Sequence, residues 1–167
     1  MISSVLISGG NKERNISVSR SVLSTITPEP TKILEVTTSG RQLYDGSETV
    51  NLTGNGQIDP MNLTQLGTSV SQWVGENSDG LVIVNDMMTL EMYHSKKSLF
   101  RFFHLLSRRC ETAGSHLVCV QSTSDSNNPF PQLFDFTVHT KSEENKFRIA
   151  STVPDDPPFS VRKLPTK

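Results

Sequence analysis

Two short runs of wholly apolar residues constrain the fold of this chain most. They are LVIV within residues 80–84 and LVCV within residues 115–121. Each run is too short for a helix and is typical of a strand that is covered on both faces. Each also follows a stretch with helical periodicity, at residues 62–74 and at residues 98–113. Strands that alternate with helices in this way predict right-handed βαβ units and a mostly parallel sheet.

The two ends of the chain extend this pattern. Residues 4–8 and 32–38 predict two further strands, and a short strand is predicted within residues 49–53. Residues 134–140 and 146–152 alternate apolar and polar side chains, which predicts an antiparallel hairpin with one solvated face. We therefore predict an α/β fold with a mostly parallel central sheet and a C-terminal antiparallel hairpin.

One domain accounts for nearly all of the sequence. A chain of 167 residues suits a single domain, which we place at residues 1–152. Residues 153–167 contain four prolines and predict an extended or disordered tail. Ligands of parallel sheets bind beyond the carboxyl ends of the strands. The turns after residues 8, 38, 84 and 121 should therefore share one rim, where we expect any site.

The composition argues against several classes of function. The formal net charge is −1, which gives no electrostatic case for nucleic acid or an anionic membrane as a standing partner. No apolar run approaches the roughly 20 residues of a membrane span. The N-terminus lacks the pattern of a secretory signal, so we expect a cytoplasmic protein. Cys110 and Cys119 lack C-x-x-C spacing and are predicted to be buried apolar side chains rather than a disulfide or a metal pair.

The first predicted strand runs into a glycine turn of the kind that opens a phosphate-binding loop. Ser8 is followed by Gly9, Gly10, Asn11 and Lys12, and then by a helical pattern. Strand, glycine turn and helix form the architecture of a P-loop, whose backbone amides and helix N-terminus bind phosphate. These five residues are therefore the candidates for nucleotide binding.

The residues that follow the turn do not complete the motif. A working P-loop reads G-x-x-x-x-G-K-[ST]. Counted from Gly9, the second glycine falls on Arg14, the lysine on Asn15 and the hydroxyl on Ile16. The pattern keeps the scaffold and lacks the usual phosphate and magnesium ligands.

A second motif lies at the end of the strand within residues 80–84, which runs into Asn85-Asp86. P-loop enzymes use a carboxylate at a strand end to hold Mg²⁺. Asp86 is therefore the candidate metal ligand. The alternative is that Asp86 caps the turn that follows.

Together these segments resemble the RecA/KaiC-like branch of P-loop ATPases, and more narrowly the short KaiC-like proteins of haloarchaea. The resemblance covers roughly residues 3–152 and rests on VLISGG, KILEVTTS, LTQLGTSVSQWV, GLVIVNDMMTLEMYHSKKSLFRFFHLLSRRCETAG and LFDFTVHT. It implies a RecA-like three-layer sandwich. It also implies assembly through faces beside the nucleotide site, and so self-association or a protein partner.

The departures from this family bear on catalysis. Family ATPases carry a glutamate after the second strand to activate water, and this chain has Thr37-Thr38-Ser39 there. The loop lysine and hydroxyl are replaced by Asn15 and Ile16. We therefore expect a non-catalytic domain that acts by protein–protein interaction as a regulator or scaffold, without a cofactor. The alternative is a residual nucleotide-binding protein or slow ATPase that uses ATP and Mg²⁺ through the Gly9–Lys12 turn and Asp86.

The helix predicted within residues 98–113 leaves further alternatives open. Phe100 and Leu105 lie off its main apolar face, which indicates either deep burial or a partner surface. A basic strip accompanies them, and it is either a solvated face or a surface for an acidic partner or nucleic acid. The strip consists of Lys96, Lys97, Arg101, Arg108 and Arg109. The four histidines show no metal-ligand spacing, and we expect surface or packing roles for them.

Overall fold

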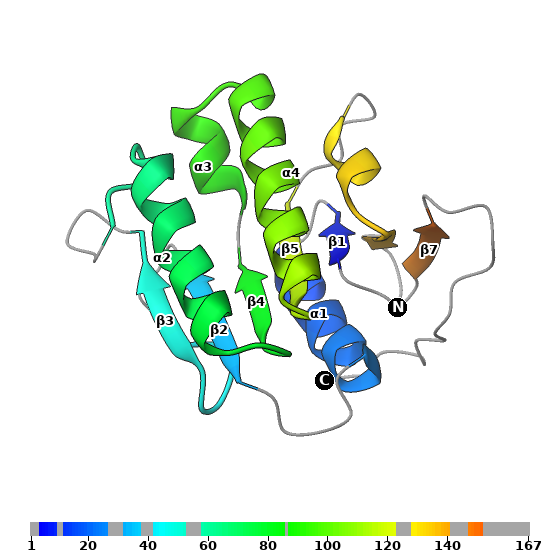
Figure 1. Cartoon of the computed structure of the whole chain (residues 1–167). Helices are drawn as coiled ribbons and strands as arrows, with labels where there is room; N and C mark the ends of the chain where they lie inside the picture. Colours follow the sequence, from blue (N-terminus) through cyan, green and yellow to red (C-terminus); the bar gives the residue numbers. More distant parts are fainter. Residues whose placement is uncertain are drawn as a thin grey trace.

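A single seven-stranded sheet forms the centre of the molecule, in the order β3-β2-β4-β5-β1-β6-β7 (Figure 1). The computed structural model describes residues 4–9, 12–26, 32–37, 42–52, 58–85, 87–122, 128–140 and 147–151. The predicted tail at 153–167 lies outside these residues. The strands are β1 (Ser4–Ser8), β2 (Ile33–Thr37), β3 (Glu48–Asn51), β4 (Leu81–Val84), β5 (His116–Gln121), β6 (Phe136–Thr140) and β7 (Phe147–Ser151).

Six of these strands, β1 to β6, pair in parallel, so the prediction of an α/β fold with a mostly parallel sheet is confirmed. The assignment of β6 needs a correction. We expected residues 134–140 to be one arm of an antiparallel hairpin that has one solvated face, but four of the five residues of β6 are buried. β6 is instead the sixth strand of the parallel sheet, with Val5 of β1 opposite Phe136. β7 pairs antiparallel with β6, with Thr140 opposite Phe147.

The helices cover both faces of the sheet and give a three-layer sandwich (Figure 1). On one face α1 packs Val18 and Val22 against inward-facing residues of β1, β4 and β5. The other face carries a larger core under the remaining helices, in which Trp73 and Phe103 are buried. The helices are α1 (Lys12–Ile26), α2 (Leu63–Glu76), α3 (Met87–Tyr93) and α4 (Lys96–Thr112), with a short 3-10 helix, η1 (Phe130–Leu133).

Local side-chain bonds explain where two of these helices begin. The Asn62 side chain accepts a hydrogen bond from the Gln65 amide at the start of α2. The Ser95 hydroxyl accepts one from the Ser98 amide at the start of α4. Such caps satisfy amides that a helix leaves without intrahelical partners. α4 therefore starts at Lys96, two residues before the expected helix.

The short helix α3 was not expected from the sequence. It buries Met87 and Leu90 and exposes Met88, Met92 and Tyr93. Two buried positions in seven residues leave no apolar stripe long enough to show helical periodicity.

Candidate functional site

The carboxyl ends of the central strands meet at one edge of the sheet, as predicted. Ser8 at the end of β1 lies opposite Gln121 at the end of β5. Val84 at the end of β4 lies opposite Cys119. The Asn85 amide then donates to the carbonyl of Val36 in β2 (3.0 Å). Of the candidate residues, Ser8 and Gly9 lie at this rim.

The glycine turn is packed closely against the sheet where it is described. The Gly9 amide donates to the Gln121 carbonyl (3.2 Å), which ties the turn to β5. A Cβ added at Gly9 would overlap the Thr140 hydroxyl and lie 2.9 Å from the Thr140 carbonyl oxygen. The approach of β6 therefore explains this glycine without a phosphate. Gly10, Asn11 and the side chain of Lys12 lie outside the described residues.

Asn15 lies at the position that a P-loop gives to its lysine, and it is 0% exposed. Its Nδ2 donates to the Gly9 carbonyl (2.9 Å). Its Oδ1 accepts a hydrogen bond from the Thr140 hydroxyl (2.6 Å). The same hydroxyl lies 3.4 Å from the Ser8 carbonyl oxygen. One uncharged side chain from α1 thus links the turn to the end of β6.

Asn85 and Asp86 follow β4 in the sequence, and of the two only Asn85 belongs to the described residues. Asp86, the candidate magnesium ligand, lies outside the described residues. Asn85 is buried, and its Nδ2 donates to Glu35 Oε1 (2.7 Å). This amide therefore belongs to an internal contact between β4 and β2.

Glu35 is the centre of a buried polar cluster that the sequence did not reveal. It lies in the middle of β2 and is 0% exposed. Besides Asn85, its carboxylate accepts hydrogen bonds from the Leu43 amide and from the Ser47 hydroxyl, both at 2.8 Å. These bonds hold residues 42–47 against the sheet. The only local signal is a charged residue inside an otherwise branched apolar strand.

Tyr44 joins this cluster to α1. Its hydroxyl lies 2.5 Å from the Ser19 hydroxyl. Burial raises the pKa of Tyr44, while the hydrogen bond to Ser19 acts in the opposite direction and the nearby Glu35 raises it further. The phenol therefore stays protonated at neutral pH and serves as a packing and hydrogen-bonding group.

A second polar cluster lies at the carboxyl end of β5. Gln121 Nε2 donates to Glu91 Oε1 (2.9 Å) and lies 3.3 Å from Asn128 Oδ1. The Asn128 amide nitrogen donates back to Gln121 Oε1, and its oxygen accepts from the Phe130 amide (3.2 Å). These bonds join α3, β5 and the start of η1. Their groups satisfy one another, which is what a structural network requires.

The described residues form neither a thiol nucleophile nor a metal cluster. Cys110 and Cys119 are free and buried, as predicted. Burial raises the pKa of Cys110 to about 12, against a smaller opposing effect of Arg109, and raises that of Cys119 well above its ordinary value. Within the described ranges no three His, Cys, Asp or Glu side chains gather as metal ligands do. None of the described helices is long and apolar enough to cross a membrane.

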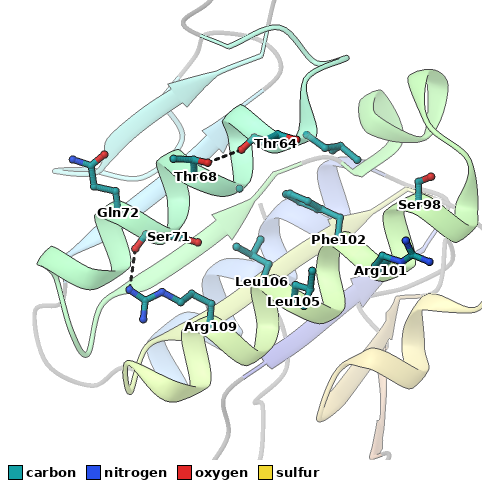
Figure 2. Close-up of a pocket in the computed structure, with 12 residues that line it drawn as sticks. Thr64, Thr68, Ser71, Gln72, Ser98, Arg101, Phe102, Leu105, Leu106 and Arg109 are labelled. Atoms are coloured by element: carbon teal, nitrogen blue, oxygen red, sulfur yellow. Dashed lines mark hydrogen bonds between the residues drawn. The ribbon is translucent and has the colours of Figure 1, made fainter.

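A groove lies away from this rim, between α2 and α4 (Figure 2). This α2/α4 groove has a volume of about 700 Å³. Gly67 on α2 leaves room for the Phe102 ring, which comes within 3.2 Å of the position of a Cβ. The groove is lined by Leu63, Thr64, Gly67, Thr68, Ser71, Gln72, Ser98, Arg101, Phe102, Leu105, Leu106 and Arg109.

Leu105 and the basic strip were the part of this groove that the sequence indicated. Leu105 is 62% exposed, which decides between burial and an open surface in favour of the surface. Phe100 is half-buried and packs towards the core near Phe130, with ring centroids 6.5 Å apart. The two off-face residues therefore have different roles. The groove itself depends on α2, which is distant in sequence, and no local pattern indicates it.

Comparison with known proteins adds no family. No protein-family model matches this sequence, and no curated protein matches it significantly.

Proposed function

We propose that this chain is a non-catalytic RecA/KaiC-like domain that acts through protein–protein interaction as a regulator or scaffold. The observation that carries the proposal is Asn15, a buried amide at the position of the P-loop lysine whose nitrogen and oxygen are both hydrogen-bonded within the chain. The parallel sheet and the glycine turn after β1 support a P-loop ancestry.

The described residues of the turn do not fit ATP·Mg²⁺. A P-loop holds phosphate with free backbone amides and a lysine. The Gly9 amide is bonded to Gln121, and Asn15 brings no charge. Loss of the charged ligand and of the hydroxyl that binds magnesium removes several kcal/mol of transition-state stabilisation. These features support a role in binding other proteins rather than in hydrolysing ATP.

A nucleotide titration tests the non-catalytic part of the proposal. We expect ATP·Mg²⁺, ADP·Mg²⁺ and GDP at millimolar concentration to leave the melting temperature of the full chain unchanged, because a ligand stabilises a protein only when it binds the folded state. Magnesium triphosphate at the same ionic strength controls for general anion effects. Release of phosphate from ATP is measured in parallel and should equal the rate without protein.

One result would favour the alternative of residual nucleotide binding. This result is a saturable rise in melting temperature with ATP·Mg²⁺ that disappears in Asp86→Ala. If turnover also disappeared in that variant, the chain would be a slow ATPase and our proposal would be wrong.

A further inference from the structure

The α2/α4 groove combines an apolar centre with positive charge. Figure 2 shows Arg101 and Arg109 on either side of Leu105 and Leu106, with Phe102 directed between the two helices. Leu105 and Phe102 keep apolar surface at the mouth of the groove. Apolar surface of this kind, rimmed by polar groups, is a feature of interaction sites.

The charged side chains that line the α2/α4 groove are all positive. The groove lining contains two arginines and no carboxylate. α4 as a whole carries five basic residues and one acidic residue, although the net charge of the chain is −1. Arg101 is exposed, and no carboxylate partner is found for it in the described part of the chain. Arg109 extends across to α2, where its guanidinium lies 3.4 Å from the Ser71 carbonyl oxygen.

The spacing of Arg101 and Arg109 indicates what kind of ligand fits the α2/α4 groove. They lie eight positions apart on α4, or about 12 Å along the helix axis. A partner helix laid along the groove would face them with carboxylates about two turns apart and would cover Leu105 and Phe102 with apolar residues between those carboxylates. We propose that the α2/α4 groove binds an acidic amphipathic helix of a partner protein.

This inference rests on the proposed function, for which it names the partner and the surface. A second copy that used the same groove symmetrically would bring arginines against arginines, because such an interface is self-complementary. Nucleic acid would meet an exposed leucine at the centre of the cationic face, where a phosphate has nothing to bind. Charge and shape together therefore favour an acidic helix of a different protein.

A peptide selection on the intact chain tests the proposal. A displayed library of random 18-residue peptides is panned against the immobilised full chain, and the enriched peptides are measured by fluorescence anisotropy. We expect enriched sequences with an excess of Asp and Glu and with apolar residues at three- and four-residue steps. Their affinity should fall with rising salt concentration, since exposed ion pairs are screened.

Three variants on α4 localise the binding. Arg101→Glu and Leu105→Asp both change exposed residues of the groove and should each weaken peptide binding by about tenfold or more. Arg108→Glu makes the same charge change on the same helix but outside the groove lining, and should change affinity by less than about twofold. Circular dichroism and the melting temperature establish that the variants fold.

Several outcomes would overturn the inference. They are the absence of enriched peptides, enrichment without acidic excess, and equal loss of affinity in all three variants. A dimer in sedimentation that Leu105→Asp dissociates would assign the groove to a second copy, and salt-dependent DNA or RNA binding lost in Arg101→Glu would assign it to nucleic acid. If peptides fail while ATP·Mg²⁺ still has no effect, the non-catalytic role stands without this partner. If peptides bind the groove and the chain also hydrolyses ATP, the partner surface stands and the proposed non-catalytic role is wrong.

Discussion

The carboxylate of Glu35 is held inside the protein by dipoles. It accepts from a backbone amide, a side-chain amide and a hydroxyl, and none of these donors carries a positive charge. The Asn85 contact is buried and the contacts with the Leu43 amide and the Ser47 hydroxyl are partly buried, so the carboxylate and its three partners depend on one another. Removal of one side of such a contact leaves buried polar groups unsatisfied, which costs more than the net contribution of the bond itself.

The variants Glu35→Gln and Glu35→Ala should therefore both destabilise the domain. Gln keeps the shape but lacks the charge and has one acceptor oxygen, so the bonds to the carboxylate weaken and the Ser47 hydroxyl loses its acceptor, which should cost about 1–3 kcal/mol. Ala leaves all three donors without their acceptor and should cost more. Urea unfolding measures the losses, with Glu111→Gln on the exposed face of α4 as the control that should be close to wild type.

The sequence could identify single residues of the site but could not predict the contacts between residues that are distant in sequence. Counting along the P-loop pattern identified Asn15 as the residue in place of the lysine. The contact between Glu35 and Asn85 joins residues 50 positions apart and leaves no periodic trace in either strand. Asn15 could be named from the sequence, but its bond to Thr140 depends on β6, which is 125 positions away.

At the scale of elements, Gly9 after β1 and Asn15 in α1 both contact the end of β6. Gly9 lies so close to Thr140 that a methyl group has no space, and Asn15 is hydrogen-bonded to the Gly9 carbonyl and to the Thr140 hydroxyl. The apolar strands and the two long helices were predictable because a buried run and an amphipathic stripe are local patterns. The short helix α3 and the packing of this turn were not, because both depend on contacts between elements.

Substitution of Gly9 tests this packing. Gly9→Ala should lower stability by about 1–3 kcal/mol, the usual cost of an extra methyl group in a filled space. Combining it with Thr140→Ala, which removes the overlapping hydroxyl, should cost less than the sum of the two single changes. Gly75→Ala in α2 is the matched control, because the nearest atom is the mobile end of Arg109 and alanine favours a helix. Strictly additive losses would contradict the close approach.

At the scale of the molecule, the described residues form two apolar cores on opposite faces of the sheet. Cys110 and Cys119 both lie in the larger core, under α2 and α4. Their thiols reach water only when that core opens, so the release of their protons is coupled to unfolding of the domain. Burial raises the pKa of Cys110 from 9.0 to about 12.

Stability should therefore fall at alkaline pH. Between about pH 9 and pH 12 the folded state keeps the Cys110 proton while the unfolded chain releases it, so the stabilisation is complete below pH 9 and is lost as pH rises through this window. The loss amounts to roughly 1 kcal/mol per pH unit for each such group. Urea unfolding at pH 7, 9, 10 and 11 should give a shallower decline for Cys110→Ala than for wild type. Parallel curves would argue against a buried, protonated thiol.

The Asn15 bonds have a consequence for how the domain would respond to the cell. A phosphate-binding loop draws part of its order from its ligand, so its shape follows the supply of nucleotide. Here the amide of Asn15 takes its partners, the Gly9 carbonyl and the Thr140 hydroxyl, from the same chain. Under the proposed function, the surface of α2 and α4 would be presented equally in starved and in energy-rich cells. Control of its binding would then come from the abundance of the chain and of its partner.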